Sequence, residues 1–133
     1  MRLLGIDLGS SFIKGGVLDL DTHRIQSVER FPFPDPLPGH PPTFREFDPD
    51  TVIRTTRGLL DRLLSHAPDA CGVVMCSQMH SLVLAARDGR PVSNVISWQD
   101  QRTLQPFRGT SRSYFEEVQS RLSPEERRDM GNE

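Results

Sequence analysis

Apolar residues in the N-terminal part of the chain fall into short runs that polar, glycine-containing turns separate. The runs lie at residues 3–8, 12–18 and 24–28. Short apolar runs bounded by Gly, Ser, Asp or Thr are typical of strands that tight turns connect. The sequence therefore predicts three antiparallel strands in a meander.

Proline dominates the next segment, because six of the twelve residues from 31 to 42 are proline. Proline lacks a backbone N–H and fits neither a helix interior nor a central strand. We predict an extended loop that aromatic side chains hold to the surface, with a partner-binding proline motif as the alternative. The aromatic residues concerned are Phe31, Phe33, Phe44 and Phe47.

A helix start signal follows at Asp48-Pro49, an N-cap residue with proline at the first helical position. Apolar residues then keep helical spacing as far as Leu64, and Pro68 marks the end. The sequence predicts one helix here. Its arginines are expected to form a solvated face: Arg54, Arg57 and Arg62.

The apolar run between Cys71 and Cys76 predicts a buried strand that the preceding helix connects to the sheet by a crossover. Five residues apart on a strand, the two cysteines face opposite sides. We therefore expect buried free thiols, without a disulfide or a four-thiolate zinc site.

Turn and cap signals organise the remaining residues. Asp88-Gly89 separates apolar runs at 81–86 and 91–97 and predicts a hairpin. Short helices are expected from Tyr114 to Leu122 and after the Ser123-Pro124 cap. Residues 111–133 are polar, as in a chain cut from something longer.

Charge and length narrow the function classes. The 133 residues fit one domain, and 16 basic against 18 acidic residues give a net charge of −2. Such a balance argues against nucleic-acid or anionic-membrane partners and favours small molecules. No apolar run is long enough for a bilayer, and no signal pattern opens the chain, so we expect a cytoplasmic protein.

The candidate chemistry lies in the first turn, where Asp7 precedes Gly9, Ser10 and Ser11. Such a turn offers backbone N–H groups to a phosphate, and the serines add donors. Asp7 could hold a hydrated Mg2+ beside the phosphate, and Lys14 could add positive charge. The alternative is an ordinary hairpin whose polar side chains bond their own backbone. Neither a Rossmann fingerprint nor a P-loop is present.

Three segments in order resemble the N-terminal part of the FGGY family of carbohydrate kinases. They are Gly5-Ile6-Asp7-Leu8-Gly9-Ser10-Ser11 through Lys14, Ser77-Gln78-Met79-His80-Ser81, and Asn94-Val95-Ile96-Ser97-Trp98-Gln99-Asp100-Gln101-Arg102. The resemblance covers almost the whole chain. The second segment is similar to the sugar-contacting strand end of the family's xylulokinase-like members.

The resemblance implies an α/β domain of the ribonuclease H-like (actin-like ATPase) fold, with a mixed sheet, three antiparallel first strands and flanking helices. Residues 1–133 would be an incomplete N-terminal sugar-kinase domain without the C-terminal nucleotide-binding domain. The implied reaction is phosphoryl transfer from ATP, with Mg2+, to a sugar hydroxyl. The aspartate that acts as general base is expected beyond residue 133, so the chain alone should be inactive.

The resemblance also implies roles for particular residues. Asp7 matches the Mg2+ site, through water, and Gly9, Ser10 and Ser11 match the turn that approaches the phosphates, with Lys14 beside them. The implied sugar contacts are Gln78, Met79, His80, Trp98 and Asp100.

Each sugar contact has a structural alternative. His80 could end a strand and bond nearby backbone, and Trp98 could belong to the core. Asp100 could be a helix N-cap that pairs with Arg102.

The substrate implied is a ketose such as xylulose rather than glycerol, because glycerol kinases carry arginine and glutamate where Met79 and His80 stand. Ser77 and Ser81 replace the usual glycines, which leaves gluconate, ribulose and sedoheptulose kinases open.

Two other classes remain as alternatives: a non-catalytic sugar- or phosphate-binding module or pseudokinase, and a sugar-independent ATPase. An isolated first domain would expose its cleft wall, so a homodimer is a further expectation.

Overall fold

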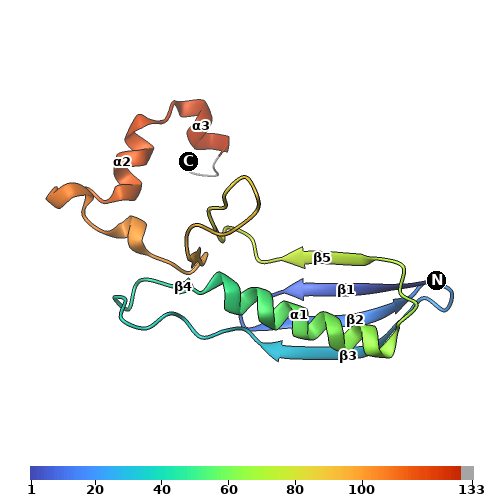
Figure 1. Ribbon diagram of the computed structural model, residues 1–133. Helices are drawn as coiled ribbons and strands as arrows, with labels where there is room; N and C mark the ends of the chain where they lie inside the picture. Colours follow the sequence, from blue (N-terminus) through green and yellow to red (C-terminus); the bar gives the residue numbers. More distant parts are fainter. Residues whose placement is uncertain (130–133) are drawn as a thin grey trace. The chain divides into compact units, whose positions relative to one another are not determined.

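The computed structural model of the chain describes residues 1–129. These residues divide into two compact units (Figure 1). The sheet unit comprises Met1–Pro38 and Glu46–Trp98, and the C-terminal unit comprises Gly39–Arg45 with the chain from Gln99 onward. No helix in the described part is long and apolar enough to cross a membrane.

The sheet unit is built on a four-stranded sheet with strand order β3-β2-β1-β5. Strands β1 (Arg2–Leu8), β2 (Phe12–Asp19) and β3 (Arg24–Pro32) form an antiparallel meander, which confirms the prediction. Strand β5 (Val73–Ser77) lies parallel to β1 on the other side. The sheet is therefore mixed, as a crossover through a helix requires.

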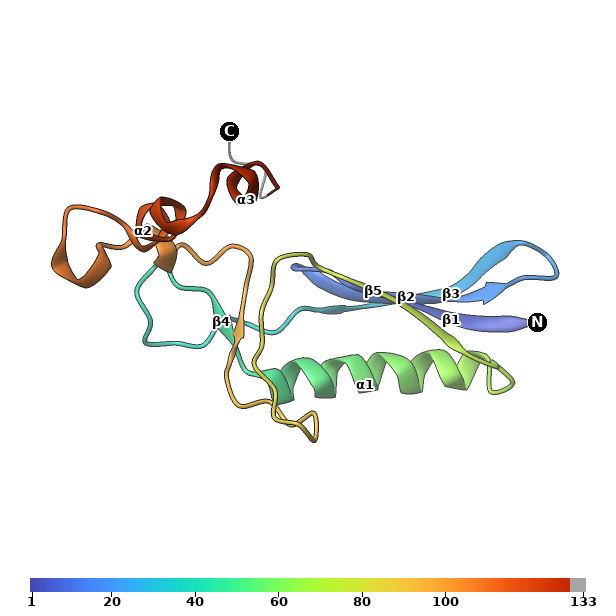
Figure 2. The same cartoon turned by 90° about the horizontal axis from the view of Figure 1, so that it is seen from above.

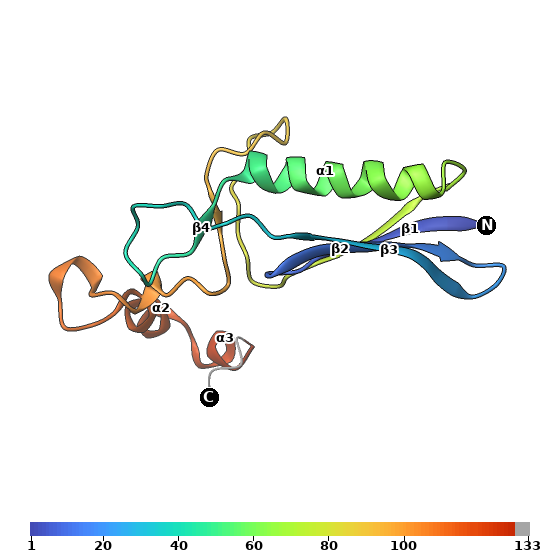
Figure 3. The same cartoon turned by 90° about the horizontal axis from the view of Figure 1, so that it is seen from below.

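That crossover is helix α1 (Pro49–His66), which lies along one face of the sheet (Figures 2 and 3). The Asp48 carboxylate accepts the backbone N–H groups of Asp50 and Thr51, so the predicted cap is confirmed. The predicted arginines are exposed. The core between helix and sheet is aliphatic and comprises Leu4, Ile6, Ile13, Val17, Leu59 and Leu63.

Helix and sheet approach closely at Gly15. A Cβ atom there would lie 2.7 Å from the Gly5 carbonyl oxygen and 2.7 Å from the Leu63 Cδ1 atom. Only glycine permits this contact without a shift of the backbone. The close packing of α1 on β1 and β2 therefore depends on the absence of a side chain at residue 15.

Aromatic residues anchor the proline-rich segment within the sheet unit, as predicted. The buried rings of Phe33 and Phe47 pack edge to face with centroids 5.0 Å apart. Phe47 belongs to β4 (Glu46–Phe47), which pairs antiparallel with β6 (Val95–Ile96). Pro32 ends β3 on the outer edge of the sheet, where a missing N–H is tolerated.

The predicted hairpin at residues 81–97 is confirmed in its turn and in the antiparallel pairing of its flanks, but the pairing is not a continuous ladder. The Ala86 N–H donates to the Arg90 carbonyl across the Asp-Gly turn, and Gly89 has φ +83°. The flanks make only isolated bridges, at Leu82–Ile96 and Ala85–Pro91. A side chain interrupts the ladder, because the Leu84 N–H donates to the Ser93 hydroxyl.

The prediction of a buried strand between the two cysteines is also wrong. All five residues of β5 are exposed, and Cys71 and Cys76 are exposed free thiols. Strand β5 is exposed because it lies at the edge of the sheet, beyond the three strands on which α1 packs, β1, β2 and β3. The predicted absence of a disulfide is confirmed.

The C-terminal unit contains short helical elements: η1 (Arg102–Leu104), η2 (Phe107–Gly109), α2 (Tyr114–Arg121) and α3 (Pro124–Asp129). The two predicted helices are thereby confirmed. Helix α2 begins with a capping box in which Ser113 and Glu116 exchange hydrogen bonds. None of the described residues of this unit is buried.

Candidate functional site

The first turn, Gly9–Ser11, connects β1 to β2 at the end where the Asp7 side chain emerges. A Cβ atom on Gly9 would lie 2.9 Å from the Phe12 carbonyl oxygen, so the turn requires glycine. Ser10 and Ser11 are exposed, and neither hydroxyl has a hydrogen-bond partner within residues 1–129. The alternative in which these side chains bond their own turn is therefore not observed.

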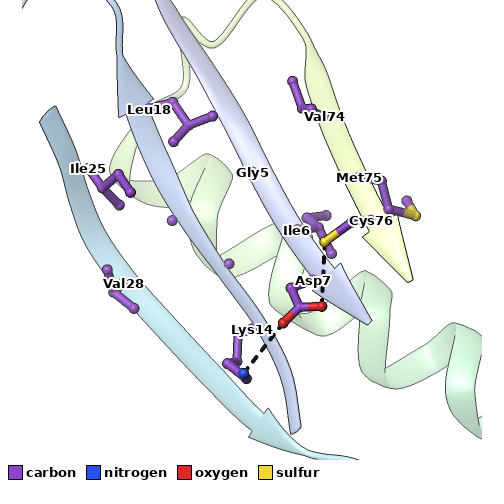
Figure 4. Close-up of a pocket in the computed structure, with 12 residues that line it drawn as sticks. Gly5, Ile6, Asp7, Lys14, Leu18, Ile25, Val28, Val74, Met75 and Cys76 are labelled. Atoms are coloured by element: carbon purple, nitrogen blue, oxygen red, sulfur yellow. Dashed lines mark hydrogen bonds and ion pairs between the residues drawn. The ribbon is translucent and has the colours of Figure 1, made fainter. Parts of the chain in front are cut away.

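Asp7 makes two side-chain contacts across the sheet (Figure 4). Its Oδ2 atom lies 3.4 Å from the Lys14 Nζ atom, and its Oδ1 atom accepts the Cys76 thiol at 3.5 Å. Strand register explains both contacts, because Asp7 faces Lys14 in β2 and Cys76 in β5. The carboxylate is 45% exposed, so its oxygens remain accessible.

The thiol of Cys76 is held in its neutral form by this arrangement. Its hydrogen bond to the Asp7 carboxylate raises the pKa of the thiol above its usual value, and desolvation and the carboxylate charge act in the same direction. A neutral thiol leaves Lys14 as the neighbouring charge that Asp7 contacts.

A shallow hollow extends from Asp7 along the sheet face that α1 does not cover. Its volume is about 430 Å³, and its walls are apolar. Figure 4 shows Asp7, Lys14 and Cys76 grouped at one end of the hollow, with Leu18, Ile25, Val28 and Val74 along the rest. Within the hollow, the polar side chains thus lie together at the end where β1 enters the first turn.

The second predicted segment forms a tight turn immediately after β5, which we call the 78–81 turn. The Gln78 N–H donates to the Leu8 carbonyl at 3.0 Å, so this turn starts beside the end of β1. Met79 is 74% exposed. His80 has the left-handed value φ +62°, which is uncommon outside glycine.

The His80 ring is exposed and makes no hydrogen bond to any described residue. The structural alternative, in which His80 bonds neighbouring backbone, is therefore not observed. The turn presents two adjacent side chains, Met79 and His80, to solvent beside the first turn. An imidazole nitrogen can donate or accept a hydrogen bond there.

Ser81 connects the 78–81 turn with Trp98. The Ser81 hydroxyl donates to the Gln78 Oε1 atom at 3.1 Å and accepts the Trp98 backbone N–H at 3.2 Å. Trp98 is 53% exposed, so the alternative that places it in the core is wrong. Four of the five predicted sugar contacts lie in the sheet unit: Gln78, Met79, His80 and Trp98.

Asp100 belongs to the C-terminal unit, where its side chain is 3% exposed. It accepts hydrogen bonds from Nε and Nη2 of Arg102 at 2.7 and 2.8 Å, and from the Arg45 N–H at 2.8 Å. The Arg102 side-chain bonds are the main reason that the pKa of Asp100 falls to about 2. Arg102 also stacks over Phe44 at 4.4 Å. The structural alternative for Asp100, pairing with Arg102, is observed.

Sequence reasoning missed two contacts of this site. It placed Cys76 in a core, whereas the thiol meets Asp7, and it treated Ser81 only as a departure from glycine. The signal for Cys76 was the pairing of residues 73–77 with residues 4–8, which sets Cys76 opposite Asp7. No local pattern signals the bond between Ser81 and Trp98, because the two residues are 17 positions apart.

The side chains of the described residues do not by themselves form a complete metal site. Within residues 1–129 no group of three or more His, Cys, Asp or Glu side chains is placed to hold a metal ion. Asp7 offers one accessible carboxylate, which fits an ion that keeps most of its ligands as water or phosphate oxygens.

Comparison with known proteins assigns the chain to a family. Residues 2–122 match the FGGY family of carbohydrate kinases, N-terminal domain. The xylulose kinase of Bacillus subtilis (strain 168) is 30% identical over 106 residues, covering 76% of this chain and 20% of that protein. The chain thus spans about a fifth of the length of this relative.

Solved structures are similar in fold. The crystal structure of xylulose kinase from Rhodospirillum rubrum aligns with a TM-score of 0.73 at 19% identity, covering 94% of this chain and 24% of the other. The crystal structure of Plasmodium falciparum glycerol kinase with ADP aligns with a TM-score of 0.72 at 17% identity. The alignment covers 94% of this chain and 24% of the other. The mixed sheet with its flanking helix is therefore the predicted ribonuclease H-like (actin-like) fold, and the chain belongs to the FGGY family of carbohydrate kinases, matching its N-terminal domain.

Proposed function

We propose that this chain supplies the N-terminal part of an ATP-dependent sugar kinase, an incomplete domain that needs a C-terminal nucleotide-binding domain. The observation that carries the proposal is the hydrogen bond from the Gln78 N–H to the Leu8 carbonyl. It brings the 78–81 turn beside the Gly9–Ser11 turn. A sugar on one turn and a phosphate on the other would then be neighbours, as phosphoryl transfer requires.

In this proposal the first turn binds phosphate. The Gly9 backbone can approach phosphate oxygens closely, and the hydroxyls of Ser10 and Ser11 have no competing partner among the described residues. Lys14 lies beside Asp7 and adds positive charge. Asp7 would hold Mg2+ through water, and a bound Mg2+ would neutralise phosphate charge.

The second turn and Trp98 bind the sugar. His80 can donate to or accept from a hydroxyl, Met79 can pack along the carbon chain, and the half-exposed Trp98 ring can cover an apolar face. A direct sugar contact from Asp100 would require a carboxylate already occupied by Arg45 and Arg102. We therefore assign Asp100 to holding its own unit and keep Gln78, Met79, His80 and Trp98 as sugar contacts.

We propose a ketose such as xylulose as the substrate. Support comes from Met79 and His80, which stand where glycerol kinases carry other residues, and from the similarity to a xylulose kinase. The general base is proposed to be an aspartate that residues 1–133 do not contain. The chain alone should then lack activity.

The test measures ADP formation by the protein encoded by the full reading frame that contains this chain, in the presence of ATP, Mg2+ and a panel of sugars. The panel is D-xylulose, D-ribulose, L-ribulose, sedoheptulose, gluconate and glycerol, and residues 1–133 alone serve as the inactive control. Asp7→Asn should lower kcat by on the order of a hundredfold, because it removes the charge that holds the ion.

The matched control is Asp61→Asn, which changes an exposed carboxylate on α1 in the same way and should leave kcat within about twofold. If no sugar raises ADP formation while the protein is folded and binds ATP, the non-catalytic module or a sugar-independent ATPase replaces the kinase. An equal effect of the two substitutions would remove the role given to Asp7.

A further inference from the structure

We propose that Ser81 is a positioning and specificity-determining residue, which fixes the Gln78 side-chain amide so that its NH2 group faces the ligand and selects an oxygen that accepts a hydrogen bond. The inference rests on the proposed function for its kinetic consequence. The hydrogen-bond geometry that carries it is independent of any activity. Ser81, Gln78 and Trp98 all belong to the sheet unit.

The first step is the hydrogen-bond capacity of one hydroxyl. A serine hydroxyl has one proton to donate and two lone pairs to accept. The Trp98 backbone N–H can only donate, and it is directed at the Ser81 Oγ atom at 3.2 Å. The single hydroxyl proton is directed at the Gln78 Oε1 atom at 3.1 Å. Oε1 is thereby occupied as an acceptor.

The second step concerns the other end of the same amide. With Oε1 held by Ser81, Gln78 can turn only its Nε2 atom away from the turn. Nε2 has no partner within residues 1–129, and no buried side-chain nitrogen or oxygen in this part of the chain lacks one. Nε2 therefore reaches solvent as an unused donor. It does so beside the exposed Met79 and His80.

The third step is what such a donor recognises. An NH2 group pairs with oxygens that accept, and a keto carbonyl or carboxylate oxygen does nothing else. The hydroxyl that replaces the carbonyl in a polyol also has a proton that must find an acceptor. The amide polarity thus favours a ketose over the corresponding polyol. The polyol oxygen can still accept from the NH2 group, so the discrimination comes from the hydroxyl proton, which is left without an acceptor at this position.

Ser81 also closes the turn that presents these groups. His80 at φ +62° is a strained conformation for a residue with a side chain, and the bond from residue 81 back to residue 78 spans that strain. A purely structural role would therefore reduce binding of every ligand equally. A role in specificity changes the ratio between ligands.

The experiment compares kcat/KM for D-xylulose and xylitol in the full reading frame. Ser81→Ala frees the Gln78 amide to rotate and should reduce the ketose-to-polyol ratio about tenfold, mainly through the KM for xylulose, the scale of one hydrogen bond. Ser81→Thr keeps the hydroxyl and should keep the ratio. Ser65→Ala removes an exposed serine hydroxyl on α1, outside the candidate site, and is the matched control.

A ratio unchanged in Ser81→Ala, with both substrates weakened equally, would overturn the specificity role. A second measurement does not depend on activity. In the 15N-labelled chain of residues 1–133, Ser81→Ala should shift the Gln78 side-chain NH2 signals and the Trp98 backbone N–H, and Ser65→Ala should shift neither.

The two measurements separate this inference from the proposed function. If no sugar is phosphorylated but the Gln78 and Trp98 signals move with Ser81→Ala, the kinase fails and the Ser81 geometry stands. If those signals do not move, the positioning role itself is wrong.

Discussion

The sheet unit packs a layer of aliphatic side chains between β1, β2 and α1, whereas the C-terminal unit buries none of its described residues. The first is stabilised by apolar area removed from water, with Leu4, Ile13, Leu59 and Leu63 almost fully covered. The second is held by caps, ion pairs and ring contacts, of which the Asp100–Arg102 pair is the best enclosed. The stability of the sheet unit therefore depends mainly on buried apolar area, and that of the C-terminal unit on individual polar and ring contacts.

The largest effect is expected from the aliphatic layer. Leu63→Ala removes a side chain with 0% exposure and should lower the free energy of unfolding by about 2–5 kcal/mol. Leu64→Ala, next to it on α1 and 42% exposed, should cost less than about 1 kcal/mol. Urea unfolding followed by circular dichroism measures both. Similar losses for the two variants would mean that α1 does not pack as described.

An intermediate effect, confined to the C-terminal unit, is expected from Asp100 and depends on pH. The folded pKa of about 2 lies below the ordinary value of 3.8, so the carboxylate stabilises the unit above the ordinary pKa. That contribution, at most about 2 kcal/mol, disappears as the pH falls through about 2. Asp100→Asn should produce the same loss at neutral pH.

Hydrogen exchange of the Arg45 amide, which donates to Asp100, measures this loss directly. The exposed Glu125→Gln is the matched control. The difference between Asp100→Asn and the parent should vanish at low pH. A difference that persists at pH 1.5 would exclude the carboxylate charge as its cause.

The smallest effect on stability is expected on the sheet face that α1 leaves open. Val28 is 70% exposed, so Val28→Thr should change the free energy of unfolding by no more than about 0.5 kcal/mol. The same change removes an apolar group from the hollow and should reduce self-association. Sedimentation velocity at several concentrations checks this. Unchanged or increased self-association in Val28→Thr would contradict the expectation that this exposed apolar face contributes to it.

Local signals made most of the fold predictable. The Asp48-Pro49 cap, the apolar runs of the meander and the Ser123 cap each act through residues a few positions away, and all were confirmed. The predictions that failed depend on how separate segments of the chain pack and pair with one another. Burial of β5 depends on how far α1 reaches across the sheet, and the strands around Asp88-Gly89 depend on a bond from Leu84 to Ser93.

Short strings in the sequence nominated the residues of the candidate site, whose roles stay predictions, but did not indicate the contacts between them. Asp7 and Lys14 lie near the turn-facing ends of β1 and β2, and a backbone bond from Gln78 to Leu8 brings the 78–81 turn, with His80, next to them. The Cys76 thiol against Asp7 required the register of β5 on β1. The bond between Arg45 and Asp100 spans 55 residues and has no counterpart in any local pattern.

Strand β5 carries a consequence for the behaviour of the chain in concentrated solution. It pairs with β1 on one side only, and its five residues, Val73 to Ser77, contain neither charge nor proline. An edge of that composition is a template to which a strand of another molecule can add, the first step toward cross-β assembly. The segment that delivers Gln78 to the site is therefore also an open edge at which chains can associate.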